Sequence, residues 1–592
     1  MKNMKKVLSL ILALAMVFSL AACGGSTAET GSGDAEEAAA TEEVVATNDS
    51  EPAYGGEVTL YYPKFYNFFD PAMINEYQYS FWFETLWTID LTKSAEYSFD
   101  ACATPVEDMT GQIAVDMGEM NYETGELTVT LRDDVYFQDK EPYNGRALTA
   151  DDVVWSYSRL LGLNGLEKVV IEDSPSDWAT TLYMLEAVEA KDEHTVVFTL
   201  GENYRNEVGY AAFVNVKVNI GGTEWDDLTD EQKSDWNYAA GTGPYILTEY
   251  VADNSMKLEK NDNYYDYDDR YPENKLPYID VINLIYLEDT ANVLAQAMAG
   301  SLDWFGENGK NVLDNTQLAQ LADAATGYTQ EYLSGSPVAI GLKVSQDQFS
   351  DVKVREAMQH AIDIEGISQV YFNIAPEDLV IPGLWSPSLN GWSTVGSWSE
   401  DLSSQFTYDP ELAKELLAEA GYPDGFTFTI QLDPTANMSI YEEAKTELAA
   451  VGITMEIEVA SEMMEAVSVS QDPTDERQFN TFGGGYSAVS LANMMVGDNS
   501  AQLQVETNGF NHDNQEVFDL LAQIQSATTV DEQASIAQQL DQIFPENHWA
   551  IDLTGVQPTY DWISSRIGGY SGEKVYYDNN MRTIWSRLWV SE

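Results

Sequence analysis

Residues 426–459 read FTFTIQLDPTANMSIYEEAKTELAAVGITMEIEV, and this stretch decides the fold class. Its first and last seven residues alternate apolar and polar side chains, as strands with one buried face do. Between them, Ile440, Ala444, Leu448 and Val451 recur at the spacing of one helical face, and Gly452 follows as a stop signal. A strand, a helix and a second strand at this spacing predict a parallel crossover, so an α/β fold is expected.

Further strands and helices are predicted on both sides of this unit. Alternating apolar residues indicate strands at 58–60, 127–131, 195–200 and 279–287. Helical patterns follow three residues that can cap a first turn, namely Thr149, Ser350 and Asp409. Pro410, just inside the third helix, and Gly421, just past its end, occupy the positions that proline and glycine favour.

The first 53 residues are expected to stand outside the folded part. Three lysines precede an apolar run at 7–20, which is too short for a membrane span and typical of a secretory signal at 1–22. Cys23 then stands where a bacterial lipoprotein signal carries its acylated thiol, although an ordinary signal with an incidental cysteine is the alternative. Residues 23–53 are acidic and lack aromatic side chains, which predicts a lipidated cysteine followed by a disordered linker.

Length and charge set limits on the architecture and on the partners. The chain of 592 residues exceeds what one core accommodates, so at least two lobes are expected. Its formal charge of −69 repels nucleic acid and anionic lipid, so we expect no nucleic-acid partner and no membrane contact except through the lipid anchor. Cys102 has no partner once Cys23 is acylated, which excludes a disulfide framework.

Motifs for catalysis or cofactor binding are missing from the sequence. It has no nucleophile elbow, no zinc-protease pair, no phosphate-binding loop and no dinucleotide fingerprint. The four histidines are scattered without ligand spacing, so no enzyme activity, no cofactor and no metal site are expected. Aromatic residues make up 12% of the chain and are dense at 61–69 and 77–87, where they could stack on sugars or peptide planes.

Five segments occur in the order found in one known family. They resemble bacterial extracellular solute-binding proteins of family 5, the oligopeptide-, dipeptide- and nickel-binding group. The segments are 131–161 (LRDDVYFQDKEPYNGRALTADDVVWSYSRLL), 241–245 (GTGPY), 258–265 (LEKNDNYY), 351–363 (DVKVREAMQHAID) and 409–426 (DPELAKELLAEAGYPDGF). The loop at 141–144 is longer than the family pattern.

This resemblance implies an α/β, two-lobed periplasmic-binding-protein-like fold with hinged closure over a central cleft. Lobe I is expected at 54–332 plus 551–592, with an extra subdomain at about 90–235, and lobe II at 333–550. The hinge candidates are 337–342 and 550–556. The protein would be a monomeric substrate-binding lipoprotein, anchored on the outer face of the cytoplasmic membrane, that delivers a small ligand to ABC permease subunits.

One departure from the family pattern concerns the ligand. Peptide-binding members carry a lobe II aspartate, in a segment like W-G-A-D-Y-x-D-P, that pairs with the ligand's α-amino group. The counterpart here is FGGGYS at 482–487, with Gly485 in the aspartate's place, unless the segment is misaligned by a few residues. A buried ammonium without a carboxylate is costly, so an oligosaccharide or other neutral solute is favoured over the family's oligopeptides.

The candidate ligand-contact residues come from both lobes and from the mouth of the cleft. They are Tyr66, Asn67, Trp304, Phe305, Trp385, Phe482, Gly485, Tyr486 and Ser487. Two alternative functions are a secreted hydrolase that uses paired carboxylates and a receptor for a signal molecule on the same fold. No catalytic pair is nominated, because a chain with 98 Asp and Glu residues offers such pairs by chance.

Overall fold

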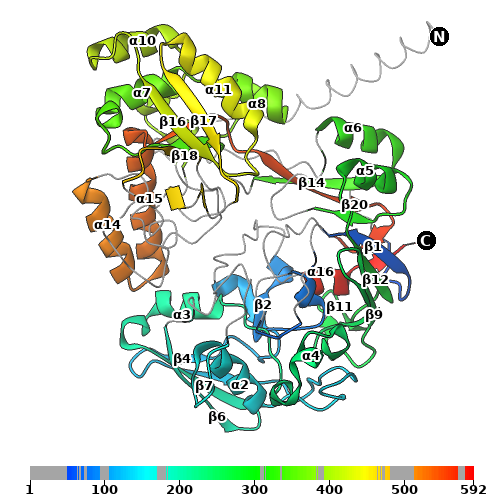
Figure 1. Cartoon of the computed structure of the whole chain (residues 1–592). Coiled ribbons are helices and arrows are strands. Elements are labelled where there is room, and N and C mark those ends of the chain that lie inside the picture. Colours follow the sequence, from blue (N-terminus) through cyan, green and yellow to red (C-terminus); the bar gives the residue numbers. More distant parts are fainter. Residues whose placement is uncertain are drawn as a thin grey trace, which may run out of the picture. The chain divides into compact units, whose positions relative to one another are not determined.

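A computed structural model of the chain describes residues 50–62, 65, 69–72, 77–93, 106–169, 182, 184–306, 313, 315–333, 337–381, 383, 393–462, 465–466, 468–469, 472, 474–480, 513–570 and 581–591. Its strands form three main sheets, with seven, five and four strands. We refer to the five-stranded sheet and its helices as lobe II, and to the other two main sheets with their helices as lobe I (Figure 1).

The seven-stranded sheet draws its strands from both ends of the folded chain. Its order is β14 (Gly327–Leu333), β20 (Pro558–Ser564), β13 (Trp304–Phe305), β1 (Glu57–Tyr61), β12 (Val281–Ile285), β9 (Ser255–Lys260) and β8 (Tyr245–Val251). β1 runs parallel to β12 and β13, and the other pairs are antiparallel. Val58 and Leu60 of β1 enter one core, whereas Tyr61 enters a second core with α5 (Thr290–Met298) and α6 (Asn315–Ala324).

The four-stranded sheet of lobe I is antiparallel throughout. Its order is β4 (Glu119–Asn121), β5 (Glu126–Thr130), β7 (Thr195–Leu200) and β6 (Leu185–Asp192). Leu127 and Val129 of β5 are fully buried, and their core is shared with Val153 and Tyr157 of α2 (Ala150–Leu161) and with Phe213 of α3 (Glu207–Val214).

The five-stranded sheet of lobe II contains the crossover predicted from the sequence. Its order is β17 (Thr454–Val459), β16 (Thr427–Leu432), β18 (Gln478–Asn480), β15 (Ala339–Gly341) and β19 (Ala550–Asp552). α11 (Met438–Ala450) connects β16 to β17, which pair in parallel from Thr427 opposite Thr454, so this prediction is confirmed.

Helices cover lobe II in two groups. α11, α7 (Val352–His360), α8 (Ile364–Phe372) and α10 (Pro410–Glu419) share one apolar core with β15, β16 and β19. α14 (Gln515–Ser526) and α15 (Val530–Asn547) form another core with Phe479 of β18. Short elements complete the description: β2 (Trp87–Ile89), β3 (Met109–Gly111), β10 (Tyr267–Asp268), β11 (Tyr271–Lys275), β21 (Ile567–Gly568), β22 (Trp589–Val590), α4 (Asp230–Lys233), α9 (Glu400–Ser404) and α16 (Met581–Arg587).

The chain passes between the two larger sheets twice, once between β14 and β15 and once between β19 and β20. The two crossings are hydrogen-bonded to each other where they enter lobe II. The Leu553 N–H donates to the Val338 carbonyl at 2.8 Å, and the Val338 N–H donates to Thr554 Oγ1 at 3.0 Å. Two lobes joined by two neighbouring chain segments are the architecture expected of a periplasmic-binding-protein-like fold.

Most helix starts agree with the capping residues read from the sequence. Asp409 accepts the Leu412 N–H at 3.0 Å, with Pro410 at the first helical position. The prediction that Ser350 caps α7 is wrong by one residue, because the Asp351 carboxylate accepts the Lys353 N–H while Ser350 donates to the Asp347 carbonyl. A carboxylate, which is also stabilised by the helix dipole, is the stronger cap of the two.

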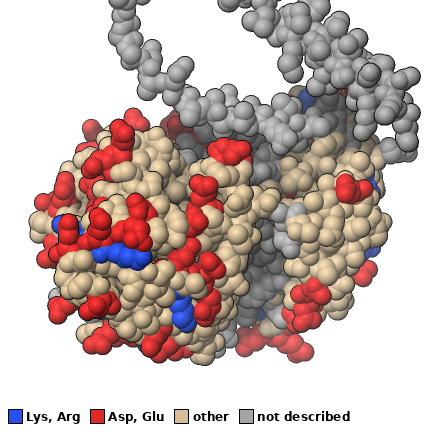
Figure 2. Space-filling view, turned by 90° about the horizontal axis from the view of Figure 1, so that it is seen from above, with Lys and Arg blue, Asp and Glu red and all other residues tan. Residues whose placement is uncertain are grey.

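The face of the molecule drawn in Figure 2 is acidic. Figure 2 shows Asp and Glu side chains spread over the visible face, with few Lys or Arg side chains among them. This distribution agrees with the formal charge of −69 and indicates a solvated surface rather than one acidic patch. Within the described residues, no helix is both long enough and apolar enough to span a membrane.

Candidate functional site

Most of the ligand-contact residues predicted from the sequence lie outside the described residues. They are Tyr66, Asn67, Trp385, Phe482, Gly485, Tyr486 and Ser487, and the predicted lipidation site Cys23 lies outside as well. Trp304 and Phe305 are described, and together they form β13. Their contact with a ligand stays a prediction.

The two side chains of β13 point to opposite faces of the seven-stranded sheet, as neighbours in a strand do. Phe305 is 1% exposed, and its ring stacks on that of Trp562 with 5.4 Å between the ring centroids. Trp304 is half-buried, and its ring stands at 79° to that of Trp585. Protein partners therefore hold both rings in fixed orientations.

Asp303 fixes β13 beside β1. Its buried carboxylate accepts the Thr59 N–H at 2.8 Å and pairs with the Arg566 guanidinium, whose Nη2 lies 2.6 Å from Oδ2. Because Thr59 belongs to β1 and Arg566 follows β20, this one carboxylate ties the short strand to both of its neighbours.

The carboxyl ends of four lobe II strands, β16, β17, β18 and β19, meet at one edge of the sheet. β18 runs parallel to β16, and β19 also runs in that direction because β18 and β19 are both antiparallel to β15. Asp433 follows β16, Asn480 ends β18 and Asp552 ends β19. In open α/β sheets, ligands bind in the crevice outside the carboxyl ends of the strands. This edge, beside both crossings, is therefore the candidate site.

Asp433 and Asn480 complete each other's hydrogen bonds. Asn480 Nδ2 donates to Asp433 Oδ2 at 2.7 Å, and Asn480 Oδ1 accepts the Asp433 N–H at 2.9 Å. The other carboxylate oxygen of Asp433 accepts the Thr435 N–H at 2.7 Å. These buried residues fix the ends of β16 and β18, immediately before the segment 482–487 that was predicted to face the ligand.

Lys343 binds the chain segment that precedes β18. The side chain is fully buried, and Nζ donates to the carbonyl oxygens of Val469, Asp472 and Asp475, each at 2.8 Å. Burial lowers the pKa of Lys343 below its usual range, although Asp475 and Asp472 act in the opposite direction. Since Lys343 follows β15, it couples the first crossing to the chain that leads into β18.

Asp552 is the third residue of the edge, and the sequence reasoning did not single it out. The residue is 7% exposed, and burial raises the pKa of its carboxyl well above the ordinary value. The sequence offered one signal, a lone acid within the otherwise uncharged stretch 549–556, but that stretch was interpreted only as a hinge.

Two of the histidines make hydrogen bonds within lobe II. His360 Nδ1 bonds to the Thr407 carbonyl at 2.7 Å, and His548 Nε2 bonds to Gln405 Oε1 at 3.0 Å. Burial lowers the pKa of His548 to about 3, which keeps the ring neutral. In the part of the chain that the structure describes, no group of three or more His, Cys, Asp or Glu side chains is placed to hold a metal ion.

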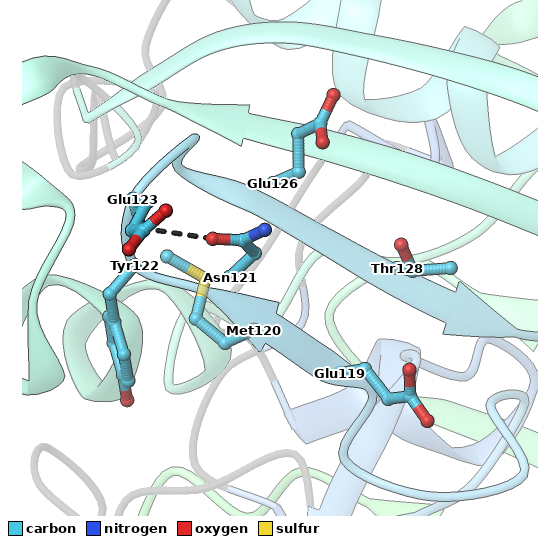
Figure 3. A pocket seen from close by; sticks show the side chains of 7 residues that line it. All are labelled: Glu119, Met120, Asn121, Tyr122, Glu123, Glu126 and Thr128. Carbon is cyan, nitrogen blue, oxygen red and sulfur yellow. Dashed lines mark hydrogen bonds between the residues drawn. The ribbon is translucent and has the colours of Figure 1, made fainter.

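A hollow of about 670 Å³ lies on the β4–β5 hairpin of lobe I (Figure 3). Its lining includes Glu119, Glu123 and Glu126, whose carboxylates point in different directions in Figure 3. Ligand pockets are mostly apolar, with a few polar groups that converge. This open, acidic hollow has neither property, so the carboxyl edge of lobe II remains the candidate.

Comparisons with known proteins support the same fold. A family model described as "Bacterial extracellular solute-binding proteins, family 5 Middle" matches residues 108–501. The oligopeptide-binding protein AppA of Bacillus subtilis is 25% identical over 425 residues, which are 68% of this chain and 70% of AppA. The heme-binding protein A of Haemophilus influenzae is 27% identical over 322 residues, 53% of this chain and 54% of that protein.

A solved structure extends the similarity over nearly the whole chain. The structure of AppA from Bacillus subtilis in complex with a nonapeptide has a TM-score of 0.61 and 18% identity, and the match covers 92% of this chain and all of AppA (100%). At this identity the likeness establishes the two-lobed fold. The matched relatives are binding proteins rather than enzymes.

Proposed function

The chain belongs to the bacterial extracellular solute-binding proteins of family 5, and on this basis we propose that it captures an oligopeptide between its two lobes for an ABC importer. The sequence alone favoured an oligosaccharide or other neutral solute, and the change of preference rests on the similarity to an oligopeptide-binding relative. The observation that carries the proposal is the carboxyl edge of lobe II, where Asp433, Asn480 and Asp552 stand beside both crossings. A ligand held there could contact lobe I as well, so its binding would favour a closed arrangement of the lobes. The permease subunits would then receive the loaded form.

The sequence predicted lobe I at 54–332 plus 551–592, with a subdomain at about 90–235, and lobe II at 333–550. We keep this division with two shifts at its boundaries, because β14 extends the lobe I sheet to Leu333 and β19 extends the lobe II sheet to Asp552. The sheet memberships of β14, β15, β19 and β20 support crossings near 334–338 and 553–557. The ligand contacts proposed from the sequence are Tyr66, Asn67, Trp304, Phe305, Trp385, Phe482, Gly485, Tyr486 and Ser487.

Lipid attachment at Cys23 would keep the protein, as a monomer, on the outer face of the cytoplasmic membrane. The support is the sequence order of a charged start, an apolar run, Leu20-Ala21-Ala22-Cys23 and an acidic linker. Replacing Cys23 by Ser should release the chain from the membrane fraction into the medium or the soluble fraction. Continued membrane association of that variant would contradict the assignment.

A neutral oligosaccharide is the second candidate ligand. The observation that favours it is the glycine-rich segment 482–487, which has no carboxylate to pair with a peptide's amino group and has aromatic residues that could stack on sugar rings. The choice between peptide and oligosaccharide has a direct test, because each class can be offered separately.

The test is a thermal-unfolding comparison of the purified protein with a peptide panel and a neutral oligosaccharide panel. A ligand at 100 times its dissociation constant stabilises the folded state by about 2.7 kcal/mol, which shifts the midpoint by a few degrees or less in a protein of this size. We expect a response to peptides. A response confined to oligosaccharides would replace the peptide assignment by the second candidate, and turnover of either panel would support the hydrolase alternative.

A further inference from the structure

Lobe I and lobe II touch at a second place besides the crossings. α3 of lobe I meets the turn between α14 and α15 of lobe II, where the Glu207 N–H donates to the Thr528 carbonyl at 3.2 Å (Figure 1). The crossings enter lobe I through β14 and β20 of the seven-stranded sheet, whereas α3 packs on the core of the four-stranded sheet. The contact and the crossings therefore involve different parts of lobe I.

The Glu207 N–H is a donor that its own helix does not use. Glu207 is the first residue of α3, and the N–H groups of a first helical turn have no acceptor within the helix. The side chain of the N-cap residue Asn206 accepts from the Gly209 N–H at 2.9 Å, which leaves the Glu207 N–H for a partner outside α3. Phe213 and Val214, both buried in the core of the four-stranded sheet, hold the helix in place.

The acceptor, the Thr528 carbonyl, is held in position by lobe II. The Thr528 N–H donates to Glu532 Oε2 at 3.1 Å, and the Glu532 N–H donates to the N-cap residue Thr529 at 3.2 Å. Ala527, directly before Thr528, is buried in the core of α14 and α15. Because donor and acceptor are both fixed within their own lobes, little ordering entropy is lost when the two lobes meet.

The contact between the lobes is of a kind that can form and break. Within the described part of the chain, each of the five apolar cores draws its residues from one lobe. Glu207 and Thr528 are both exposed, so water can replace each partner when the lobes separate. A hydrogen bond that exchanges with water in this way contributes only a modest net free energy. It can bias the arrangement of the lobes without locking it.

We propose that Glu207 and Thr528 form a latch between the lobes, which favours the closed arrangement before any ligand is bound. The inference rests on the two-lobed fold, and only its consequence for ligand entry rests on the proposed function. One such hydrogen bond raises the ratio of closed to open molecules about 2- to 12-fold. Ligand entry then requires this bond to break, and the same bond re-forms when the lobes close around the ligand.

A proline at position 207 removes the donor with little other change. Proline is favoured at the first helical position, and Asn206 before it is extended (φ −146°, ψ 177°), as the residue before a proline should be. Glu207→Gln keeps the N–H and removes only the charge. Glu400→Pro is the matched control, because Glu400 is the first residue of α9, follows the extended N-cap residue Ser399 and belongs to a helix that packs within lobe II.

The quantity measured is the distance between the lobes in the unliganded full chain. Spin labels are attached to azide-bearing amino acids that replace Glu193 of lobe I and Gln523 of lobe II, both exposed. Pulsed electron paramagnetic resonance then gives the populations of short and long distances. We expect E207Q and E400P to keep the parent's ratio of long to short distances, and E207P to raise this ratio about 2- to 12-fold.

An unchanged ratio in E207P would overturn the latch. An equal rise in E207Q would overturn it as well, because the charge and not the N–H would then be responsible. If E207P does not fold, hydrogen exchange of the Glu207 amide in the unliganded parent decides: exchange at least about twofold slower than that of an unprotected amide supports the bond, and exchange at the unprotected rate overturns it. A chain that binds no peptide would refute the proposed function and would alter neither of these results.

Discussion

Glu84 has a fully buried carboxylate to which four residues from three segments of lobe I donate hydrogen bonds. Its Oε1 accepts hydrogen bonds from Gln112 Nε2 at 2.9 Å, from the Tyr264 hydroxyl at 2.9 Å and from the Tyr265 hydroxyl at 3.1 Å, and its Oε2 accepts from Thr242 Oγ1 at 2.7 Å. Thr242 belongs to the segment GTGPY and the two tyrosines to LEKNDNYY, both of which resemble family segments. We therefore predict that removing this charge loosens the whole lobe.

The magnitude follows from these contacts. A hydrogen bond to a charged group contributes about 1.5–3 kcal/mol and a neutral one about 0.5–1.5, so Glu84→Gln weakens each of the three bonds to Oε1 by about 1 kcal/mol. The Thr242 hydroxyl can rotate to accept a bond from the new amide group. Part of the loss is offset because an amide is less costly to bury than a carboxylate. We expect the free energy of unfolding to fall by about 2 kcal/mol.

The assay is urea unfolding followed by tryptophan fluorescence, with Glu123→Gln as the matched control on the exposed β4–β5 hairpin. Because a two-lobed chain need not unfold in one step, the quantity compared is the free energy of the transition that the control shares with the parent, obtained from its midpoint and slope. The reasoning would be refuted if E84Q and the parent differed by less than about 0.5 kcal/mol, the range typical of surface substitutions.

Three further predictions concern lobe II. Lys343→Met leaves three carbonyl oxygens without their shared donor and should lower the free energy of unfolding by about 2–4 kcal/mol. Urea titration measures this loss, which the surface variant Lys353→Met should not show. The pKa of about 3 for His548 lies below the value of 6.5 for an unperturbed ring, so the folded state should lose stability as the pH drops from about 6.5 toward 3. His548→Gln should flatten this part of the pH profile of thermal unfolding. The pKa of Asp552 is raised, so the parent should lose stability relative to the Asp552→Asn variant as the pH rises above about 4. If the difference in stability between the two proteins is the same at all pH values, the burial of this carboxyl is contradicted.

The fold could be predicted because its signals are local. The alternation at 426–432 and 453–459 and the helical spacing between them specify β16, α11 and β17 without knowledge of the rest of the chain. Helix starts are equally local, and even the error at Ser350 is of one residue, since Asp351 next to it is the better cap. The two lobes needed more than periodicity, and here the order of the family-like segments supplied the arrangement.

The site was harder to predict because its properties depend on residues far apart in the sequence. Phe305 was selected as an aromatic residue, but its stacking on Trp562 depends on the pairing of β13 with β20. Asp552 was passed over because its burial depends on the pairing of β19 with β15 and on Gln359 of α7 outside it. Neither partner is evident from the stretch 549–556, in which a lone acid among apolar residues can be exposed or buried.

The hydrogen bonds around the end of β19 bear on how binding and closure are linked. Asp552 directly precedes the second crossing, where Leu553 and Thr554 are hydrogen-bonded to Val338 of the first crossing. On the other side, Gln359 of α7 holds the backbone N–H and carbonyl of Asp552. A ligand at the carboxyl edge of lobe II would therefore lie beside the two chain segments that must accommodate any change between open and closed lobes.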